Sequence, residues 1–193
     1  ALIAFNFKEI NKFLLSKSFI NYPQLQWVHV PIAGVDKFMH LFNEMDFKLT
    51  CSKKINNINV SEHVLALILY LSRQIKFSSN FSKKSSFQRP IELHGKKSLI
   101  VGYGSIGKRT AIIFKKMGIE IDAINSEENQ KKSSIVNKFY KLENLSKIIN
   151  KYDLVLVTIA LTNKTKQIFN KIIFNKINKN IIFINVARAE VIH

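Results

Sequence analysis

Residues 98–118 read SLIVGYGSIGKRTAIIFKKMG, an apolar strand followed by a glycine-rich turn and an amphipathic helix. In such a turn, Gly102 permits the tight exit from the strand, and Gly104 lets the backbone approach a pyrophosphate. Gly107 allows the helix to pack close to the sheet. Because the helix amino terminus presents free N–H groups and a positive dipole end, the pattern predicts a dinucleotide site.

The second predicted strand, residues 119–124, ends at Asn125, where folds of this kind contact the adenosine ribose. An acidic residue there would bond both ribose hydroxyls and repel a 2′-phosphate. Asn125 is neutral, so it can bond the hydroxyls without repelling a 2′-phosphate. Ser126 can bond a phosphate, while Glu127 and Glu128 oppose one. The sequence therefore leaves the choice between NAD and NADP open.

Strands and helices alternate from residue 98 onward, with further strands expected at residues 153–159 and 181–185 and helices around residues 142–149 and 164–173. The continuous apolar runs indicate a sheet that is buried on both faces. The alternation indicates right-handed βαβ crossovers. We therefore predict an α/β fold with a doubly wound, Rossmann-type parallel sheet.

The amino-terminal part contains a second, shorter set of elements. A strand near residues 27–30 breaks into a turn at Gly34, a short amphipathic helix follows over residues 38–45, and another strand is expected at residues 49–51. The polar residues 52–57 mark the boundary between two domains.

Asn59 and Glu62 have the spacing of a capping box, which predicts a helix from Val60 to about Ile75. Its apolar residues cover more than half of the helix circumference and include Val64, Leu65, Leu67, Ile68 and Leu71. Such a helix is buried on two sides, either in a core or in a subunit interface.

The formal net charge of +17 raises the question of a nucleic-acid partner, because a basic face gains affinity from released counterions. The excess is almost entirely lysine, and the lysines are scattered rather than interleaved with aromatic residues. This composition argues against a nucleic-acid partner.

The sole cysteine, Cys51, fits a reducing cytoplasm and argues against a cysteine-based metal site. The longest apolar run, residues 64–71, is far short of the roughly 20 residues of a membrane span.

Four ordered motifs, in residues 25–38, 60–75, 102–107 and 185–190, together resemble the D-isomer-specific 2-hydroxyacid dehydrogenases, the family that includes glyoxylate and hydroxypyruvate reductases. The resemblance implies a partial, flavodoxin-like substrate domain over residues 1–57 and an NAD(P)-binding domain over residues 58–193. It further implies hydride transfer between a nicotinamide cofactor and a small 2-keto or 2-hydroxy acid, and a homodimer formed through Val60 to Ile75.

The same resemblance assigns site residues. Arg188 would be the catalytic residue that holds the carboxylate and the ketone, and the backbone at Ala33 and Gly34 would bind the carboxylate. The expected cofactor contacts are Gly102, Gly104, Ser105, Ile106, Gly107, Asn125, Ile159, Ala160, Thr162 and Thr165.

Several positions depart from the family pattern. Ala160 stands where proline is usual and Ala189 stands where glycine is usual. The family also usually has asparagine and glycine near Cys51 and Lys54. The acid–base histidine of the family and its carboxylate partner lie beyond the equivalent of Arg188, so we expect a fragment lacking both ends, inactive by itself. The alternative function is a dinucleotide-binding regulatory protein without turnover, like the corepressors that share this fold.

Overall fold

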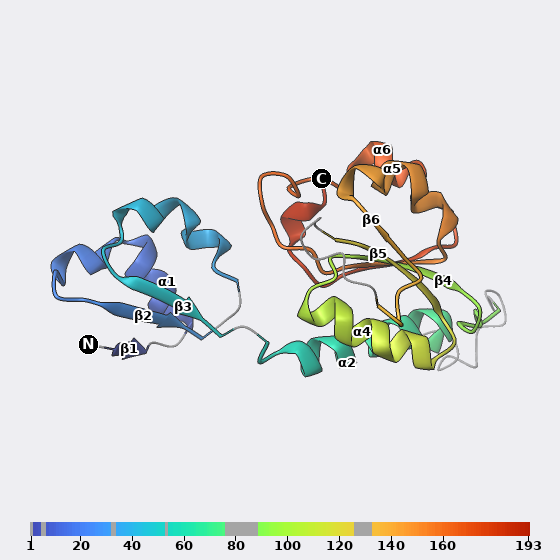
Figure 1. Ribbon diagram of the computed structural model, residues 1–193, viewed down its shortest axis with the longest axis horizontal. Helices are drawn as coiled ribbons and strands as arrows, with labels where there is room; N and C mark the ends of the chain where they lie inside the picture. Colours follow the sequence, from blue (N-terminus) through green and yellow to red (C-terminus); the bar gives the residue numbers. More distant parts are fainter. Residues whose placement is uncertain (1, 5–6, 32–33, 53, 76–88, 126–132) are drawn as a thin grey trace, which may run out of the picture. The chain divides into compact units, whose positions relative to one another are not determined.

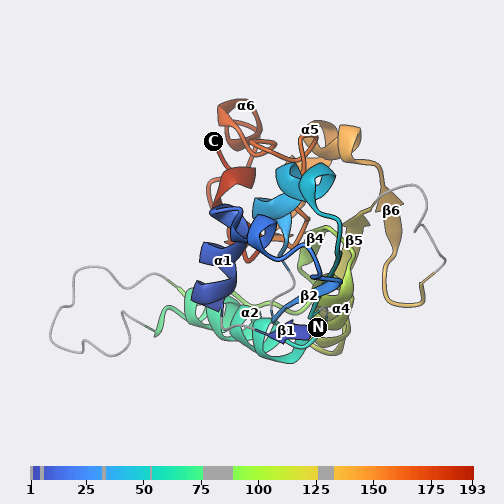
Figure 2. The same cartoon turned by 90° about the vertical axis from the view of Figure 1, so that its left-hand side faces the viewer.

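A computed structural model describes residues 2–4, 7–31, 34–52, 54–75, 89–125 and 133–193. The chain divides into two compact units, Ala1–Asn56 and Asn57–His193. Figures 1 and 2 show the elements of each unit in two perpendicular views.

The first unit is a small three-stranded parallel sheet with helical segments. Its elements are β1 (Leu2–Ala4), α1 (Phe7–Leu15), the 3-10 helix η1 (Ser18–Asn21), β2 (Trp27–Val30), the 3-10 helix η2 (Asp36–Glu44) and β3 (Lys48–Cys51). The strands lie in the order β1-β2-β3. Val28 and Val30 on β2 pack with Ile10 and Leu14 of α1 and with Phe38 of η2 in one buried cluster.

The second unit contains five parallel strands. Its strands are β4 (Lys97–Val101), β5 (Glu120–Ile124), β6 (Lys138–Tyr140), β7 (Leu154–Val157) and β8 (Ile182–Asn185). Its helices are α2 (Asn57–Ser72), α4 (Ser105–Lys116), α5 (Leu145–Ile148) and α6 (Lys171–Phe174), with 3-10 helices η4 (Leu142–Asn144), η5 (Ile149–Lys151) and η6 (Ala189–Val191). The order β6-β5-β4-β7-β8 confirms the predicted doubly wound, Rossmann-type sheet.

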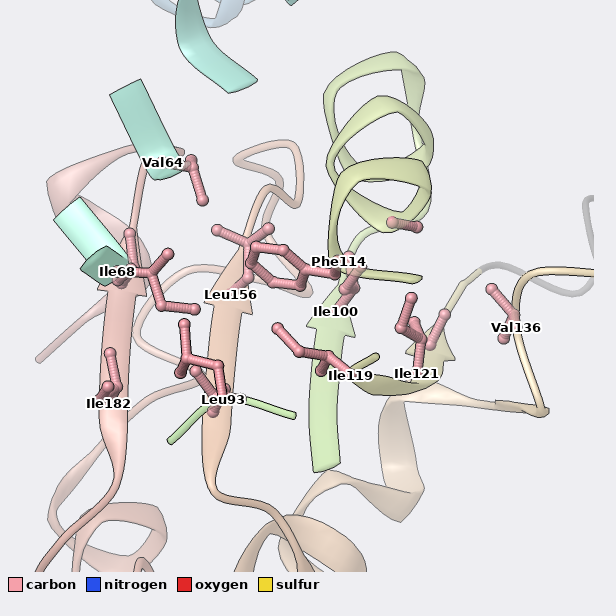
Figure 3. Packing of buried hydrophobic residues seen from close by; sticks show 14 of the residues in the cluster. Val64, Ile68, Leu93, Ile100, Phe114, Ile119, Ile121, Val136, Leu156 and Ile182 are labelled. Carbon is pink, nitrogen blue, oxygen red and sulfur yellow. The ribbon is translucent and has the colours of Figure 1, made fainter. Parts of the chain in front are cut away.

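Each face of this sheet is covered by a hydrophobic layer. On one face, Val64 and Ile68 of α2 and Phe114 of α4 pack over Ile100 and Leu156 (Figure 3). On the opposite face, a second buried cluster joins β4, β7 and β8 to α5 and α6, which lie across the sheet from α2 and α4 (Figure 1). Residues 99 and 101 face this second cluster, whereas residues 98 and 100 do not, as the alternation of side chains in a strand requires.

The boundaries of two predicted helices are wrong. The helix expected from Val60 begins at Asn57, so Asn59 lies inside it and the proposed capping box does not form. Three asparagines occur within residues 56–59, and each is a suitable start, so pattern alone did not select among them. The helix expected over residues 164–173 is replaced by turns and by α6, because the Asn170 side chain accepts hydrogen bonds from the backbone N–H groups of Ile172 and Ile173.

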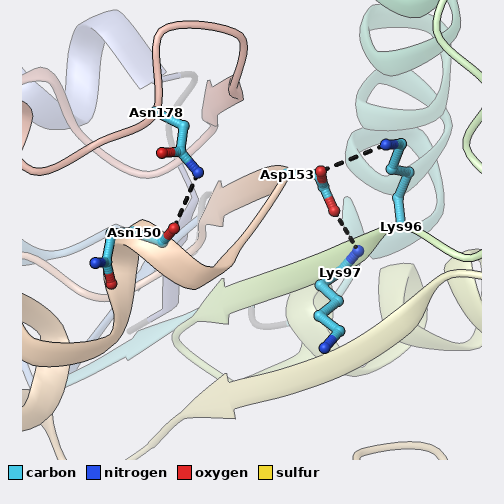
Figure 4. Close-up of polar contacts among 5 residues, drawn as sticks. All are labelled: Lys96, Lys97, Asn150, Asp153 and Asn178. Carbon is cyan, nitrogen blue, oxygen red and sulfur yellow. Dashed lines mark hydrogen bonds and ion pairs between the residues drawn. The ribbon is translucent and has the colours of Figure 1, made fainter.

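The amino-terminal ends of β4 and β7 are joined by a polar contact. Asp153, just before β7, accepts a hydrogen bond of 2.9 Å from the backbone N–H of Lys97 and lies 3.5 Å from the ammonium of Lys96 (Figure 4). Nearby, the Asn178 side-chain amide donates to the Asn150 carbonyl O at 2.9 Å. These contacts hold the sheet together at the edge opposite the glycine turn.

Candidate active site

The glycine turn follows β4 at the carboxyl edge of the sheet. It lies where the strand order reverses, between β4 and β7. Gly102 has a φ of 102°, a region that L side chains rarely adopt, and a Cβ there would lie 2.6 Å from the backbone nitrogen of Ile159. A Cβ on Gly107 would overlap the carbonyl oxygen of Gly102 and lie 3.1 Å from a side-chain carbon of Ile100. Both positions therefore need glycine for the fold itself.

Gly104 differs from the other two glycines. A Cβ built on it meets no atom within 4 Å, so the space beside its backbone is open. Gly104 is also the N-cap residue of α4, and no side chain caps the first turn, which begins with Ser105 and Ile106. The backbone N–H groups of that turn and the open space beside Gly104 suit an anion such as pyrophosphate.

The segment after β7 lies against the glycine turn and is organised by threonine hydroxyls. Thr165 is 5% exposed, and its hydroxyl donates to the Ala160 carbonyl O at 2.7 Å and accepts from the Thr162 N–H at 2.7 Å. Ile159 is partly buried in the adjacent core, whereas Ala160 and Thr162 are exposed. Thr165 thus shapes the loop from within, and Ala160 and Thr162 form its outer surface.

Asn125 directly follows β5 at the same edge of the sheet, and its backbone N–H donates to the Tyr140 carbonyl O at 3.2 Å. This contact ties the end of β5 to the end of β6. The neighbouring Ser126, Glu127 and Glu128 lie outside the described residues.

Arg188 lies at the carboxyl edge too, just beyond β8. The Asn185 side chain holds its loop, since the amide nitrogen donates to the Arg188 carbonyl O at 3.0 Å and the amide oxygen accepts from the Ala187 N–H at 3.0 Å. Asn185 was predicted only as the end of a strand, although an asparagine at a strand end is a common signal for such a turn. Ala189 opens the 3-10 helix η6 and does not have a positive φ, so its backbone does not require glycine.

In the first unit, Gly34 lies in the loop between β2 and η2, and Ala33 lies outside the described residues. Lys54, in the segment after β3, has a φ of 75°. A non-glycine residue is strained in that region, which glycine adopts freely.

The described residues contain no group of three or more His, Cys, Asp or Glu side chains able to hold a metal ion. No helix within those residues has the length and apolar character needed to cross a bilayer. A cavity of about 1210 Å³ is lined by Lys96, Leu154 and Ile182, among other residues, and therefore lies at the amino-terminal edge of the sheet, away from the glycine turn.

Comparison with known proteins agrees with this geometry. Residues 65–193 match the family model described as D-isomer specific 2-hydroxyacid dehydrogenase, NAD binding domain. The D-3-phosphoglycerate dehydrogenase of Bacillus subtilis is 30% identical over 144 residues, which is 71% of this chain and 26% of that enzyme. The D-lactate dehydrogenase of Streptococcus pyogenes serotype M1 is 26% identical over 166 residues, covering 83% of this chain and 49% of that enzyme.

The fold also matches a solved structure. The crystal structure of a D-isomer specific 2-hydroxyacid dehydrogenase family protein from Aeromonas salmonicida superposes with a TM-score of 0.81 at 24% identity, covering 98% of this chain and 65% of that one. This chain spans about half or less of the length of the two curated relatives above. The family match over two thirds of the chain, together with the glycine turn, shows that this protein belongs to the D-isomer-specific 2-hydroxyacid dehydrogenase family.

Proposed function

We propose that this chain provides the cofactor-binding part of an oxidoreductase that transfers hydride between NAD or NADP and a small 2-keto or 2-hydroxy acid of the D series. The observation that carries the proposal is the open space beside Gly104 at the start of α4, in a turn whose other two glycines are closed in by protein atoms. When bound, the nicotinamide cofactor supplies the hydride chemistry, and the protein supplies binding and orientation.

The chain's own residues have separate binding tasks. The N–H groups of Ser105 and Ile106 bind the pyrophosphate, because they lie in the uncapped first turn of α4. Asn125 bonds the adenosine ribose from the end of β5, and its neutral amide accommodates either cofactor. The exposed Ala160 and Thr162 lie beside the adenosine half.

Arg188 is the residue that we assign to the substrate. Its planar guanidinium can bind two oxygens at once, so one side chain holds the carboxylate and polarises the ketone. The Asn185 side chain supports this task because it holds the Arg188 carbonyl O at 3.0 Å. By the family resemblance, we also assign carboxylate binding to backbone N–H groups at Ala33 and Gly34.

We further assign residues 1–57 to the substrate domain and residues 58–193 to the NAD(P)-binding domain. Cys51 is a free thiol, which suits a reducing compartment, and we propose a cytoplasmic location. Cell fractionation, with a thiol-reactive label that reports whether Cys51 is reduced, tests this location. Recovery of the protein from an oxidising compartment would contradict it.

The test of the function uses the natural full-length protein with reduced NAD and NADP and a panel of small 2-keto acids, followed by loss of reduced-nicotinamide absorbance. Arg188→Lys keeps the charge but loses the two-pronged contact, so kcat and kcat/KM should fall together by at least about tenfold. Arg89→Lys, at the opposite edge of the sheet, is the matched control and should leave both unchanged.

Two outcomes would contradict parts of this proposal. Tight dinucleotide binding without turnover of any 2-keto acid would favour a regulatory protein over an enzyme. Turnover at the parental rate by Arg188→Lys, with KM also unchanged, would remove Arg188 from the site.

We also propose that the protein forms a homodimer through the segment from Val60 to Ile75, most of which lies in α2. Val64 and Ile68 face the core of the unit, yet Tyr70 and Leu71 on the same helix remain 41% and 43% exposed. Leu71→Lys should therefore shift the protein toward monomer in light scattering. Ile172→Lys, at an equally apolar but 66% exposed position on α6, is the control that should leave the mass unchanged. A monomeric parent protein at micromolar concentration would contradict the dimer.

A further inference from the structure

Thr158, the first residue after β7, holds the glycine turn with both its backbone and its side chain. Its backbone N–H donates to the Val101 carbonyl O at 2.8 Å, and its hydroxyl donates to the Gly102 carbonyl O at 2.5 Å. One residue from the neighbouring strand thus contacts both the last residue of β4 and the first residue of the turn.

The same hydroxyl also lies beside the third glycine. A Cβ on Gly107 would lie 3.1 Å from Thr158 Oγ1 and would overlap the Gly102 carbonyl O. The Thr158 hydroxyl, the Gly102 carbonyl and the Gly107 backbone therefore pack together at one point. Because Gly107 belongs to the first turn of α4, this point fixes the position of the helix amino terminus relative to the end of β4.

We infer that Thr158 is a positioning residue for cofactor binding, which aims the amino terminus of α4 at the pyrophosphate through the Gly102 carbonyl. The Gly102 carbonyl and the Tyr103 N–H share one rigid peptide plane, so a rotated carbonyl also rotates that N–H within the turn. Gly102 is buried, and a buried carbonyl without a hydrogen-bond donor is costly. Without the Thr158 hydroxyl, the Gly102 carbonyl would therefore rotate toward another donor. The inference rests on the proposed function, in which the pyrophosphate binds at this helix end.

The experiment compares three variants of the full-length protein by titration with NADH and NADPH and by steady-state kinetics. Thr158→Val keeps the shape of the side chain but has no donor, while Thr158→Ser keeps the donor. Thr110→Val is the matched control, since Thr110 is a fully buried threonine of α4 whose hydroxyl has no hydrogen-bond partner among the described residues.

Thr158→Val should weaken dinucleotide binding by roughly tenfold, the effect of one neutral hydrogen bond of about 1.4 kcal/mol. The KM for cofactor should rise with it, while the KM for the keto acid and kcat at saturating cofactor stay near the parental values. Thr158→Ser should restore binding to within about twofold, and Thr110→Val should bind as the parent does.

A merely structural role would lower the melting temperature of Thr158→Val without changing the dinucleotide affinity measured well below that temperature, and this result would overturn the inference. An equal loss of affinity in Thr110→Val would overturn it as well, because that loss would reflect general packing. If the parent protein bound neither dinucleotide, the proposed function would fail, and the positioning role with it.

Discussion

The three glycines of the turn should respond differently to a single added methyl group, and the differences follow from the space around each one. In Gly107→Ala the methyl overlaps the Gly102 carbonyl O and crowds Ile100. Overpacking of this kind costs about 3 kcal/mol, and the better helix propensity of alanine offsets about 1 kcal/mol. The net loss of about 2 kcal/mol should lower the melting temperature by roughly 6–10 °C for a domain of this size.

Gly102→Ala should be the most damaging of the three substitutions. Its φ of 102° adds about 1–2 kcal/mol of backbone strain to the collision with the backbone of Ile159. The predicted loss of about 4 kcal/mol is a large fraction of the stability of an ordinary domain. We expect this variant to accumulate poorly or to melt far below the parent protein.

Gly104→Ala should behave in the opposite way. No atom lies within 4 Å of the added methyl, and the φ of −79° and ψ of −160° suit an alanine. The free energy of unfolding of the unliganded variant should therefore stay within about 1 kcal/mol of the parent value. The loss from the weaker N-cap nearly cancels the gain from a stiffer unfolded chain. The bound pyrophosphate would meet the methyl, which should reduce NADH affinity by ~1–3 kcal/mol, or roughly 5- to 150-fold.

Thermal melting of the unliganded proteins and fluorescence titration with NADH measure the two effects separately. An open space beside Gly104 is contradicted if Gly104→Ala melts far below the parent while its NADH affinity is intact. A closed Gly107 is contradicted if Gly107→Ala is as stable as the parent, because the contacts around Gly107 would then be less tight than its backbone indicates.

The arrangement of the second unit was predictable because its signals are local in the sequence: the glycine turn, the apolar strands and the regular spacing between strands and helices. The edge strand β6 and the segment β1–α1 were not predicted. The three residues of β6 are too few for a periodic signal, and Lys138 gives this edge a charged start. The contacts of Thr158 and Asn185 were missed for a different reason. Both depend on which strands become neighbours, since Thr158 and Gly102 are 56 residues apart in the chain.

Three further substitutions test other parts of the structure. Lys54→Gly should stabilise the protein by about 1 kcal/mol in denaturant unfolding, because glycine adopts the φ of 75° without strain; unchanged stability would contradict a strained Lys54. Asn170→Ala should destabilise α6 by about 1 kcal/mol through the loss of two cap hydrogen bonds, and Lys171→Ala beside it is the control for composition. Tyr152→Phe should cost about 1–3 kcal/mol at neutral pH, since it removes the 2.7 Å hydrogen bond to Asp122. Burial, the hydrogen bond to Asp122 and the charge of that carboxylate raise the pKa of Tyr152, so its neutral form stabilises the fold below about pH 10 and this contribution is lost as the pH rises further. The parent protein should then lose stability above about pH 10 more steeply than Tyr152→Phe, and parallel pH profiles would contradict the assignment.

The departures from the family pattern are not equivalent in physical terms. At Ala189 the backbone forms an ordinary 3-10 turn, at Ala160 the carbonyl accepts a hydrogen bond from Thr165, and neither residue has a positive φ. Lys54 alone among these three retains a left-handed backbone that suits glycine. A non-glycine residue with a positive φ thus occurs in the segment after β3, whereas in the cofactor turn the positive φ belongs to Gly102. Substitutions that relax Lys54 should change stability while leaving dinucleotide affinity unaltered, whereas those at Gly104 should change affinity and leave stability nearly unaltered.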